Sequence, residues 1–274
     1  MQRRSTGWQR GTTMSKTLYL ECYSGISGDM TVAALLDLGA DREVLKESLK
    51  SLPVGGFRTE ITRVKRSGLD ACDFSVILEQ DNHDHDMEYL HGSEKSYTGH
   101  HEHSHEVNHE HTHSHEYPHE HRGMKEITEI IQKSKMTARA KKMAMRVFDI
   151  LAQAESKAHG VPVEEVHFHE VGAVDSIVDI AAIAICMDNL DISNVIVPVL
   201  YEGTGFIRCQ HGQIPVPVPA VTHIAETHKL KLKITDIQGE LVTPTGAAVV
   251  AAFRTSDRLP EDFTMLKTGI GAGK

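Results

Sequence analysis

The chain has 274 residues, of which 40% are apolar and 24% charged, so it can bury a sizeable core and has an ordinary globular composition. Its formal net charge of −9 is concentrated in residues 81–122, where ten acidic side chains stand against Lys95 and Arg122, a balance of −8. The remainder is nearly neutral, which gives no support for a nucleic-acid-binding surface. The four cysteines lie far apart without a Cys-x-x-Cys pair. This spacing disfavours a zinc ribbon or an iron–sulfur site and fits a reducing compartment.

Neither a membrane anchor nor a secretion signal is expected. The longest apolar run, 177–187, is too short to span a bilayer and contains Asp179. Residues 1–13 are polar and lack the apolar centre of a signal peptide. We expect them to be a non-native or disordered leader, with Met14 the better natural start, and the protein to be cytoplasmic.

The first structured segment is expected over residues 14–80. Its patterns predict, in chain order, a buried strand at Thr17–Cys22, a helix from the Ser24–Asp29 turn to about Leu38, a helix at Asp41–Ser51, and a hairpin of Phe57–Lys65 and Cys72–Glu79.

Residues 81–123 are expected to form a disordered, metal-binding insertion, because the stretch has almost no apolar residues. It holds 13 of the 19 histidines in the stretch 81–122, several with His-x-His spacing. Neutral imidazole binds Ni(II), Cu(II), Zn(II) and Co(II), so composition alone does not choose the metal. The expected ligands in this insertion are His100, His101, His103, His105, His109, His111, His113, His115, His119 and His121. The alternative is a passive, solvated linker.

The second structured segment is expected over residues 124–274, packed on the first. Its patterns predict helices at Met124–Ser134 and Thr137–His159, an extended Val166–His169, a buried helix at Asp175–Leu190, a strand at Val195–Leu200, an extended proline-rich lead into a helix at Ala220–His228, a strand at Leu230–Ile237 and a helix at Thr245–Phe253. Strands that alternate with helices indicate an α/β fold, with α+β possible, and a mixed sheet with flanking helices.

The first candidate site is the turn that joins the first strand to its helix. Free N–H groups at a helix N-terminus bind anions, so Ser24, Gly25, Ser27 and Gly28 are candidates for holding a cofactor or substrate phosphate. Asp29 could ligate a divalent ion or orient a polar group. The other interpretation is a tight turn in which Ser27 or Asp29 only caps the helix.

The second candidate site combines two histidines with three carboxylates. In an extended segment His167 and His169 point to the same side, and Glu170 follows directly. Asp175 and Asp179 share a helix face at i, i+4. The set predicts a metal site or an acid–base pair. Alternatively, Asp175 caps the helix and the histidines lie on the surface.

Two weaker motifs follow. Thr243, Thr245 and Gly246 lie where a loop enters a helix, and they could cap it or receive a phosphate or carboxylate. His211 precedes a stiff, proline-rich stretch that also reads as a rigid connector.

Taken in order, Cys22–Met30, the histidine-rich insertion, His167–Asp179 and Glu240–Gly246 resemble the LarC family of nickel insertion proteins. The resemblance runs from about Ser15 to the end of the chain. It implies a CTP-dependent, lyase-class nickel chelatase that inserts Ni(II) into pyridinium-3,5-bisthiocarboxylic acid mononucleotide, giving the nickel-pincer cofactor that lactate racemase receives.

The same resemblance places CTP, with Mn(II) or Mg(II), in a C-terminal domain that would begin after Lys267–Lys274. We therefore expect the chain to be the N-terminal, metal-delivering part, and we keep a homo-oligomer as an open option for its assembly. The histidine-rich insertion would collect nickel, while His167, His169 and Glu170 would pass it on or supply a base.

Two other functions remain open from the residues themselves. The chain could be a non-catalytic nickel or zinc store or chaperone, in which the folded part binds no substrate. It could also be a phosphate-ester enzyme that uses Asp29, Asp175 and Asp179 on Mg(II) or Mn(II).

Overall fold

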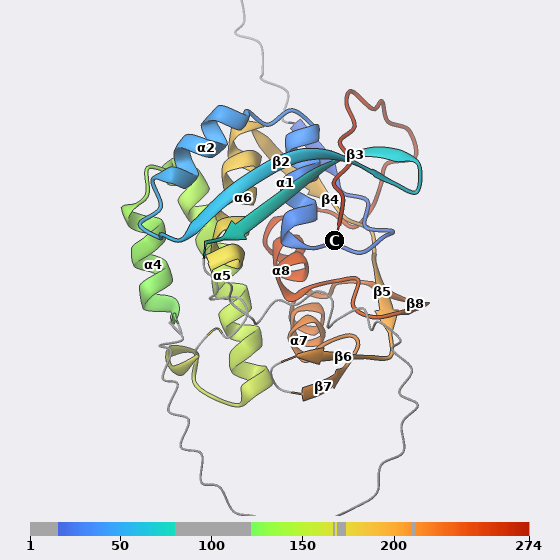
Figure 1. Ribbon diagram of the computed structural model, residues 1–274. Helices are drawn as coiled ribbons and strands as arrows, with labels where there is room; N and C mark the ends of the chain where they lie inside the picture. The colour runs from blue at the N-terminus through green and yellow to red at the C-terminus, as the bar shows by residue number, and fades with distance from the viewer. Residues whose placement is uncertain (1–15, 80–121, 167, 169–173, 210–211, 274) are drawn as a thin grey trace, which may run out of the picture.

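The computed structural model describes residues 16–79, 122–166, 168, 174–209 and 212–273. The leader, residues 81–121 of the histidine-rich insertion with its ten candidate ligands, and His167, His169, Glu170 and His211 lie outside the described residues. In the described part, the α/β class is confirmed (Figure 1).

Helices form the centre of the molecule, and α6 (Val174–Asn189) lies among them. Its turns from Ile177 to Met187 are buried almost throughout, except at Asp179, which is why it reads as apolar on all sides. Around it pack α1 (Gly28–Asp37), α2 (Arg42–Lys50), α5 (Ala138–His159) and α8 (Pro244–Phe253). In turn, α4 (Met124–Lys133) and α7 (Pro219–His228) pack against α5.

Local sequence signals explain the bounds of the long helix α5. The Thr137 hydroxyl accepts a hydrogen bond from the Ala140 N–H at 3.0 Å, which caps the first turn. The helix ends at Gly160, whose φ of +68° is the left-handed conformation that glycine adopts freely. These bounds are those expected from the sequence.

Among the described residues, the strands form four pairs. Two pairs are parallel, β1 (Lys16–Tyr19) with β4 (Ile192–Ile196) and β5 (Leu200–Thr204) with β8 (Leu232–Gln238). Two are antiparallel hairpins, β2 (Phe57–Arg66) with β3 (Leu69–Leu78) and β6 (Phe206–Cys209) with β7 (Gly212–Pro215). A parallel bridge between Cys22 and Leu200 joins the extension of β1 to β5, so β1, β4, β5 and β8 run in the same direction.

Two strand predictions were wrong in detail, and one hairpin was not predicted. The strand expected at Val195–Leu200 is two strands, β4 and β5, because Pro198 lies between them and cannot donate to a ladder. The first strand ends at Tyr19, although Cys22 still pairs with Leu200. The β6–β7 hairpin was not expected. Pro215 closes β7 and Pro219 occupies the first turn of α7, as proline tolerates both places.

The end of the described chain packs between α1 and the hairpin. The Cys72 N–H donates to the Ile270 carbonyl at 2.9 Å, and the Ala272 N–H to the Cys72 carbonyl at 2.8 Å. A Cβ atom on Gly269 or Gly271 would overlap backbone atoms of α1. Glycine at alternate positions therefore lets an extended segment lie directly against a helix.

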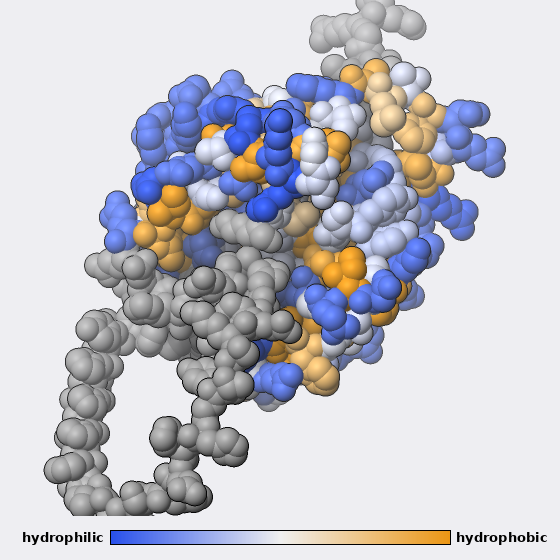
Figure 2. All heavy atoms as spheres, turned by 45° about the vertical axis from the view of Figure 1, so that its right-hand side comes forward, coloured by the Kyte–Doolittle hydropathy of each residue, from blue (hydrophilic) through white to orange (hydrophobic). Residues whose placement is uncertain are grey.

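The described residues contain no helix with the length and apolarity needed to cross a membrane. On the face shown in Figure 2, hydrophilic side chains surround separate apolar patches. Exposed apolar side chains include Phe206 and Ile234.

Candidate functional site at the strand ends

Two helix N-termini, those of α1 and α8, meet beyond the carboxyl ends of the parallel strands. The loop before α1 pairs with the loop before α8: the Ile26 N–H donates to the Leu241 carbonyl at 2.8 Å, and the Thr243 N–H to the Ile26 carbonyl at 3.1 Å. In open α/β sheets, ligands bind in the crevice at this end of the strands. We call this region, residues 22–29, 175–179 and 239–246, the strand-end site.

Glycine is required for the two loops to approach so closely. Gly25 has a φ of +83°, and a Cβ atom there would overlap the Leu241 carbonyl. A Cβ atom on Gly246 would overlap the Ile26 carbonyl. Both glycines singled out in the sequence therefore have a steric role in this contact.

The N-terminus of α1 is capped by its own side chains. The Ser27 hydroxyl contacts the Asp29 carboxylate and accepts from the Met30 N–H at 3.4 Å. Asp29 Oδ1 also accepts from the Met30 N–H, at 2.9 Å. The capping interpretation therefore holds for Ser27, and Asp29 adds a negative charge beside the N–H groups of Gly28 and Asp29. Ser24 is exposed. It lies in the turn that is closed by the hydrogen bond from the Gly25 N–H to the Cys22 carbonyl.

Asp179 of α6 lies against the start of α1. A Cβ atom on Gly28 would be 2.6 Å from Asp179 Oδ2, so only glycine leaves room for this carboxylate. Asp175 stands one helical turn earlier on α6, on the same face. The structure thus brings Asp179 next to the helix that carries Asp29.

The N-terminus of α8 is capped as the sequence predicts. The Thr243 hydroxyl accepts from the Gly246 N–H at 3.1 Å, and Pro244 occupies the first helical position. Thr245 is almost fully buried in the first turn.

Sequence reasoning missed Glu202 on β5. Its side chain is fully buried, and Oε1 accepts from the backbone N–H groups of Gly203, Leu241 and Val242 at 2.8, 2.8 and 3.1 Å. The only sequence signal is a glutamate in the middle of a short strand, LYEGT, and a buried carboxylate needs such donors.

The described residues offer the strand-end site oxygen ligands rather than sulfur. Burial raises the pKa of the Cys22 thiol to about 12, so at neutral pH it is not a thiolate. No group of three or more histidine, cysteine, aspartate or glutamate residues within the described ranges is placed to hold a metal ion. The predicted cluster of His167, His169 and Glu170 falls just before α6, among the residues that are not described.

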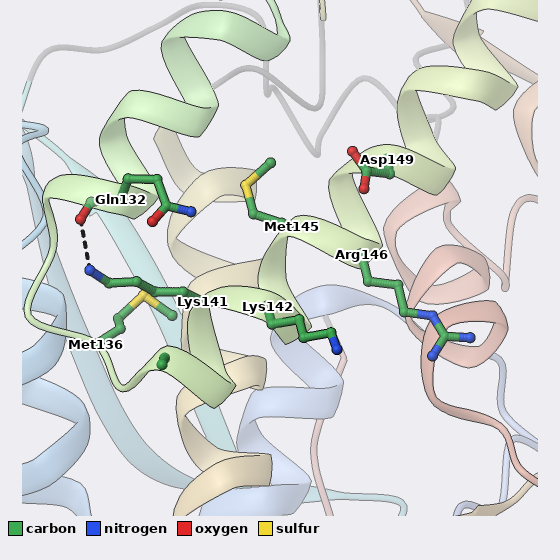
Figure 3. Close-up of a pocket in the computed structure, with 8 residues that line it drawn as sticks. Gln132, Met136, Lys141, Lys142, Met145, Arg146 and Asp149 are labelled. Carbon is green, nitrogen blue, oxygen red and sulfur yellow. Dashed lines mark hydrogen bonds between the residues drawn. The ribbon is translucent and has the colours of Figure 1, made fainter.

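A second region, which we call the α4–α5 groove, carries basic side chains, whereas the strand-end site carries carboxylates. It has a volume of about 720 Å³ and is lined by Gln132, Met136, Ala138, Lys141, Lys142, Met145, Arg146 and Asp149. Figure 3 shows the Lys141 ammonium at the Gln132 carbonyl, a distance of 2.7 Å, and Lys142 and Arg146 extending from α5. Burial raises the pKa of the Asp149 carboxyl.

Comparison with known proteins gives a consistent result. The model of the family described as "Nickel insertion protein" matches residues 18–274. The chain is 52% identical over 261 residues to the pyridinium-3,5-bisthiocarboxylic acid mononucleotide nickel insertion protein of Alkaliphilus metalliredigens, covering 95% of this chain and 57% of that protein. It is 35% identical over 259 residues to the protein of the same name from Acetivibrio thermocellus, covering 94% and 57%.

The chain thus spans little more than half the length of these relatives. No solved structure matches it. Because the family model covers almost the whole chain and the first of these relatives is more than half identical, the chain belongs to the nickel insertion protein family.

Proposed function

We propose that the chain takes part in inserting Ni(II) into pyridinium-3,5-bisthiocarboxylic acid mononucleotide, and that the strand-end site binds this mononucleotide. The observation that carries the proposal is the meeting of the α1 and α8 N-termini at the carboxyl ends of parallel strands. The relatives' names supply the substrate. A phosphate is the group of that substrate which helix N-termini recognise.

Different groups of the site would bind the negative and the positive parts of the reactants. The N–H groups of Gly28 and Asp29 and the first turn of α8 would face the phosphate. Asp29, Asp175 and Asp179 would attract Ni(II) or orient the pyridinium ring, since carboxylates favour cations.

His167, His169 and Glu170 precede Asp175 by only a few residues in sequence. We propose that they transfer nickel or remove the proton from the ring carbon between the two thiocarboxylates. The histidine-rich insertion would raise the local concentration of nickel.

We further propose that the chain corresponds to the N-terminal, metal-delivering part of a lyase-class chelatase in the cytoplasm. The remaining part of the relatives would supply CTP binding with Mn(II) or Mg(II). The nickel-pincer product would pass to lactate racemase.

The test is activation of apo-lactate racemase by this chain, with the mononucleotide, Ni(II), CTP and Mn(II), in parallel with and without the remaining part of a relative. Activation only with that part supports a metal-delivering half. Activation without it would overturn the division of labour. No activation in either reaction, with nickel still bound, would overturn the proposal in favour of a metal store.

A further inference from the structure

Glu202 is a polar side chain in a place where burying a polar group is costly. The side chain is 0% exposed, and one of its two oxygens, Oε1, receives three backbone N–H donors. Its other oxygen, Oε2, is buried without a hydrogen-bond partner in the part of the chain that the structure describes. An apolar side chain of similar size would fill this space without the desolvation cost. The carboxylate therefore has a role that filling space does not explain.

The places of the three N–H donors in the fold indicate what Glu202 does. Gly203 follows Glu202 on β5, whereas Leu241 and Val242 belong to the turn after β8. The backbone of the same turn lies directly against β5: a Cβ atom on Gly203 would overlap the Gly239 carbonyl. One carboxylate oxygen thus ties the turn down onto the strand.

The turn passes this constraint on to both helix N-termini. Leu241, held through its N–H, accepts from the Ile26 N–H through its carbonyl. The next contact, from the Thr243 N–H to the Ile26 carbonyl, leads to the residue that caps α8. Ile26 is followed directly by Ser27, the residue that caps α1. Glu202 is therefore connected to both caps through consecutive backbone hydrogen bonds.

We infer that Glu202 is a positioning residue that sets the spacing between the N-termini of α1 and α8, and hence the fit of the mononucleotide phosphate. The inference rests on the proposed function of the strand-end site. Glu202 itself does not touch the ligand. It acts by holding backbone donors in one arrangement before the ligand arrives.

Two substitutions separate this role from simple packing. Glu202→Gln keeps a carbonyl oxygen for the three N–H donors, whereas Glu202→Met fills the space without an acceptor. Asp188 provides matched controls as Asp188→Asn and Asp188→Met. Its carboxylate accepts from the Thr137 hydroxyl at 2.6 Å at the other end of α6, away from the strand-end site.

The measurements are binding of pyridinium-3,5-bisthiocarboxylic acid mononucleotide by calorimetry and amide hydrogen exchange at Leu241 and Val242. We expect Glu202→Met to weaken binding roughly tenfold or more, because the N–H groups of Gly203, Leu241 and Val242 lose their shared acceptor and the turn is no longer held. Exchange at the two amides should speed up together. Glu202→Gln should bind within about threefold of the unaltered protein, and both Asp188 variants should leave binding and these amides unchanged.

The inference is overturned if folded Glu202→Met binds normally, or if Glu202→Gln binds as weakly as Glu202→Met, because the charge itself would then matter. Should Glu202→Met not fold, Gly203→Ala, which displaces the turn with Glu202 intact, must show the same loss. If the unaltered protein fails to bind the mononucleotide while the Leu241 and Val242 amides are protected, the proposed function fails. The hydrogen bonds from these amides to Glu202 would still be supported.

Discussion

The strand-end site and the α4–α5 groove differ in what creates them. In the strand-end site, glycines let backbone segments touch, helix caps orient N–H groups, and a buried carboxylate holds the turn. The lining of the groove is mostly side chains of α5, among them the long side chains of Lys141, Lys142 and Arg146. Backbone donors fixed before binding lose little entropy when a ligand arrives, whereas lysine and arginine side chains must be ordered. The groove, despite its volume of about 720 Å³, is therefore the poorer candidate for a specific site.

The strongest contrast is expected from alanine at two glycines with positive φ. Gly25→Ala adds backbone strain and an overlap with the Leu241 carbonyl, while Gly160→Ala at the end of α5 adds strain alone, since nothing lies within 4 Å of its Cβ position. We expect about 1 kcal/mol of destabilisation at Gly160. The loss at Gly25 should be about 3 kcal/mol or more. Denaturant titration measures both, and equal losses would show that the loops are not packed as described.

The next contrast concerns charge. Asp179→Asn should lower nickel insertion by roughly tenfold or more, the usual effect of altering a group at or beside a metal. The double variant Lys142→Gln/Arg146→Gln should leave it within about twofold, because these side chains lie in the groove. Racemase activation, with the remaining part of a relative present, measures both variants. A larger loss in the double variant would reverse the assignment of the two regions.

Two helix caps can be compared. Thr243→Ala and Thr137→Ala each remove a hydroxyl that accepts from a backbone N–H, a loss of about 1 kcal/mol of stability. Thr137→Ala also removes the hydrogen bond that this hydroxyl donates to Asp188, so it should cost at least as much. Only Thr243→Ala should also weaken mononucleotide binding, because Thr137 lies at the start of α5. Thermal unfolding and calorimetry on the same samples separate the effects. Weaker binding in both variants would mean that binding follows overall stability.

The smallest effect is expected at Asp149 in the groove. Because burial raises its folded pKa, the folded state favours the protonated carboxyl, so the group's contribution to stability is present at low pH and is lost as the pH rises through the folded pKa. Asp149→Asn should therefore stabilise the protein slightly at neutral pH. The difference from the unaltered protein should vanish below the ordinary pKa of aspartate. Unfolding measured at several pH values tests this prediction. If Lys142 or Arg146 instead favoured the carboxylate, Asp149→Asn would destabilise the protein at neutral pH.

Local signals in the sequence predicted much of the fold and part of the strand-end site. The caps of α1 and α8 were among the sequence predictions, because a hydroxyl three residues before an N–H has a fixed geometry. Gly25 and Gly246 were singled out as ligand-binding residues, which stays a prediction; the structure shows their role in the contact between the two loops.

What the sequence did not reveal depends on partners distant in the chain. Glu202 binds N–H groups some 40 residues away, as the separations of 39 and 40 residues to Leu241 and Val242 show. Gly269 and Gly271 matter only because α1 lies against them. The pairing of residues 24–28 with 241–246 is equally non-local, and no periodic pattern encodes such a contact. The roles of His167, His169 and Glu170 remain predictions.

The most direct test of the central claim is to map which backbone amides respond when the mononucleotide is added to the isotope-labelled chain without nickel. The account predicts that NMR signals of Gly25, Gly28, Thr245 and Gly246 shift together, with saturation at one affinity. It predicts no change at Lys141, Lys142 and Arg146. Shifts confined to the α4–α5 groove, or none in the strand-end site at saturation, would contradict it.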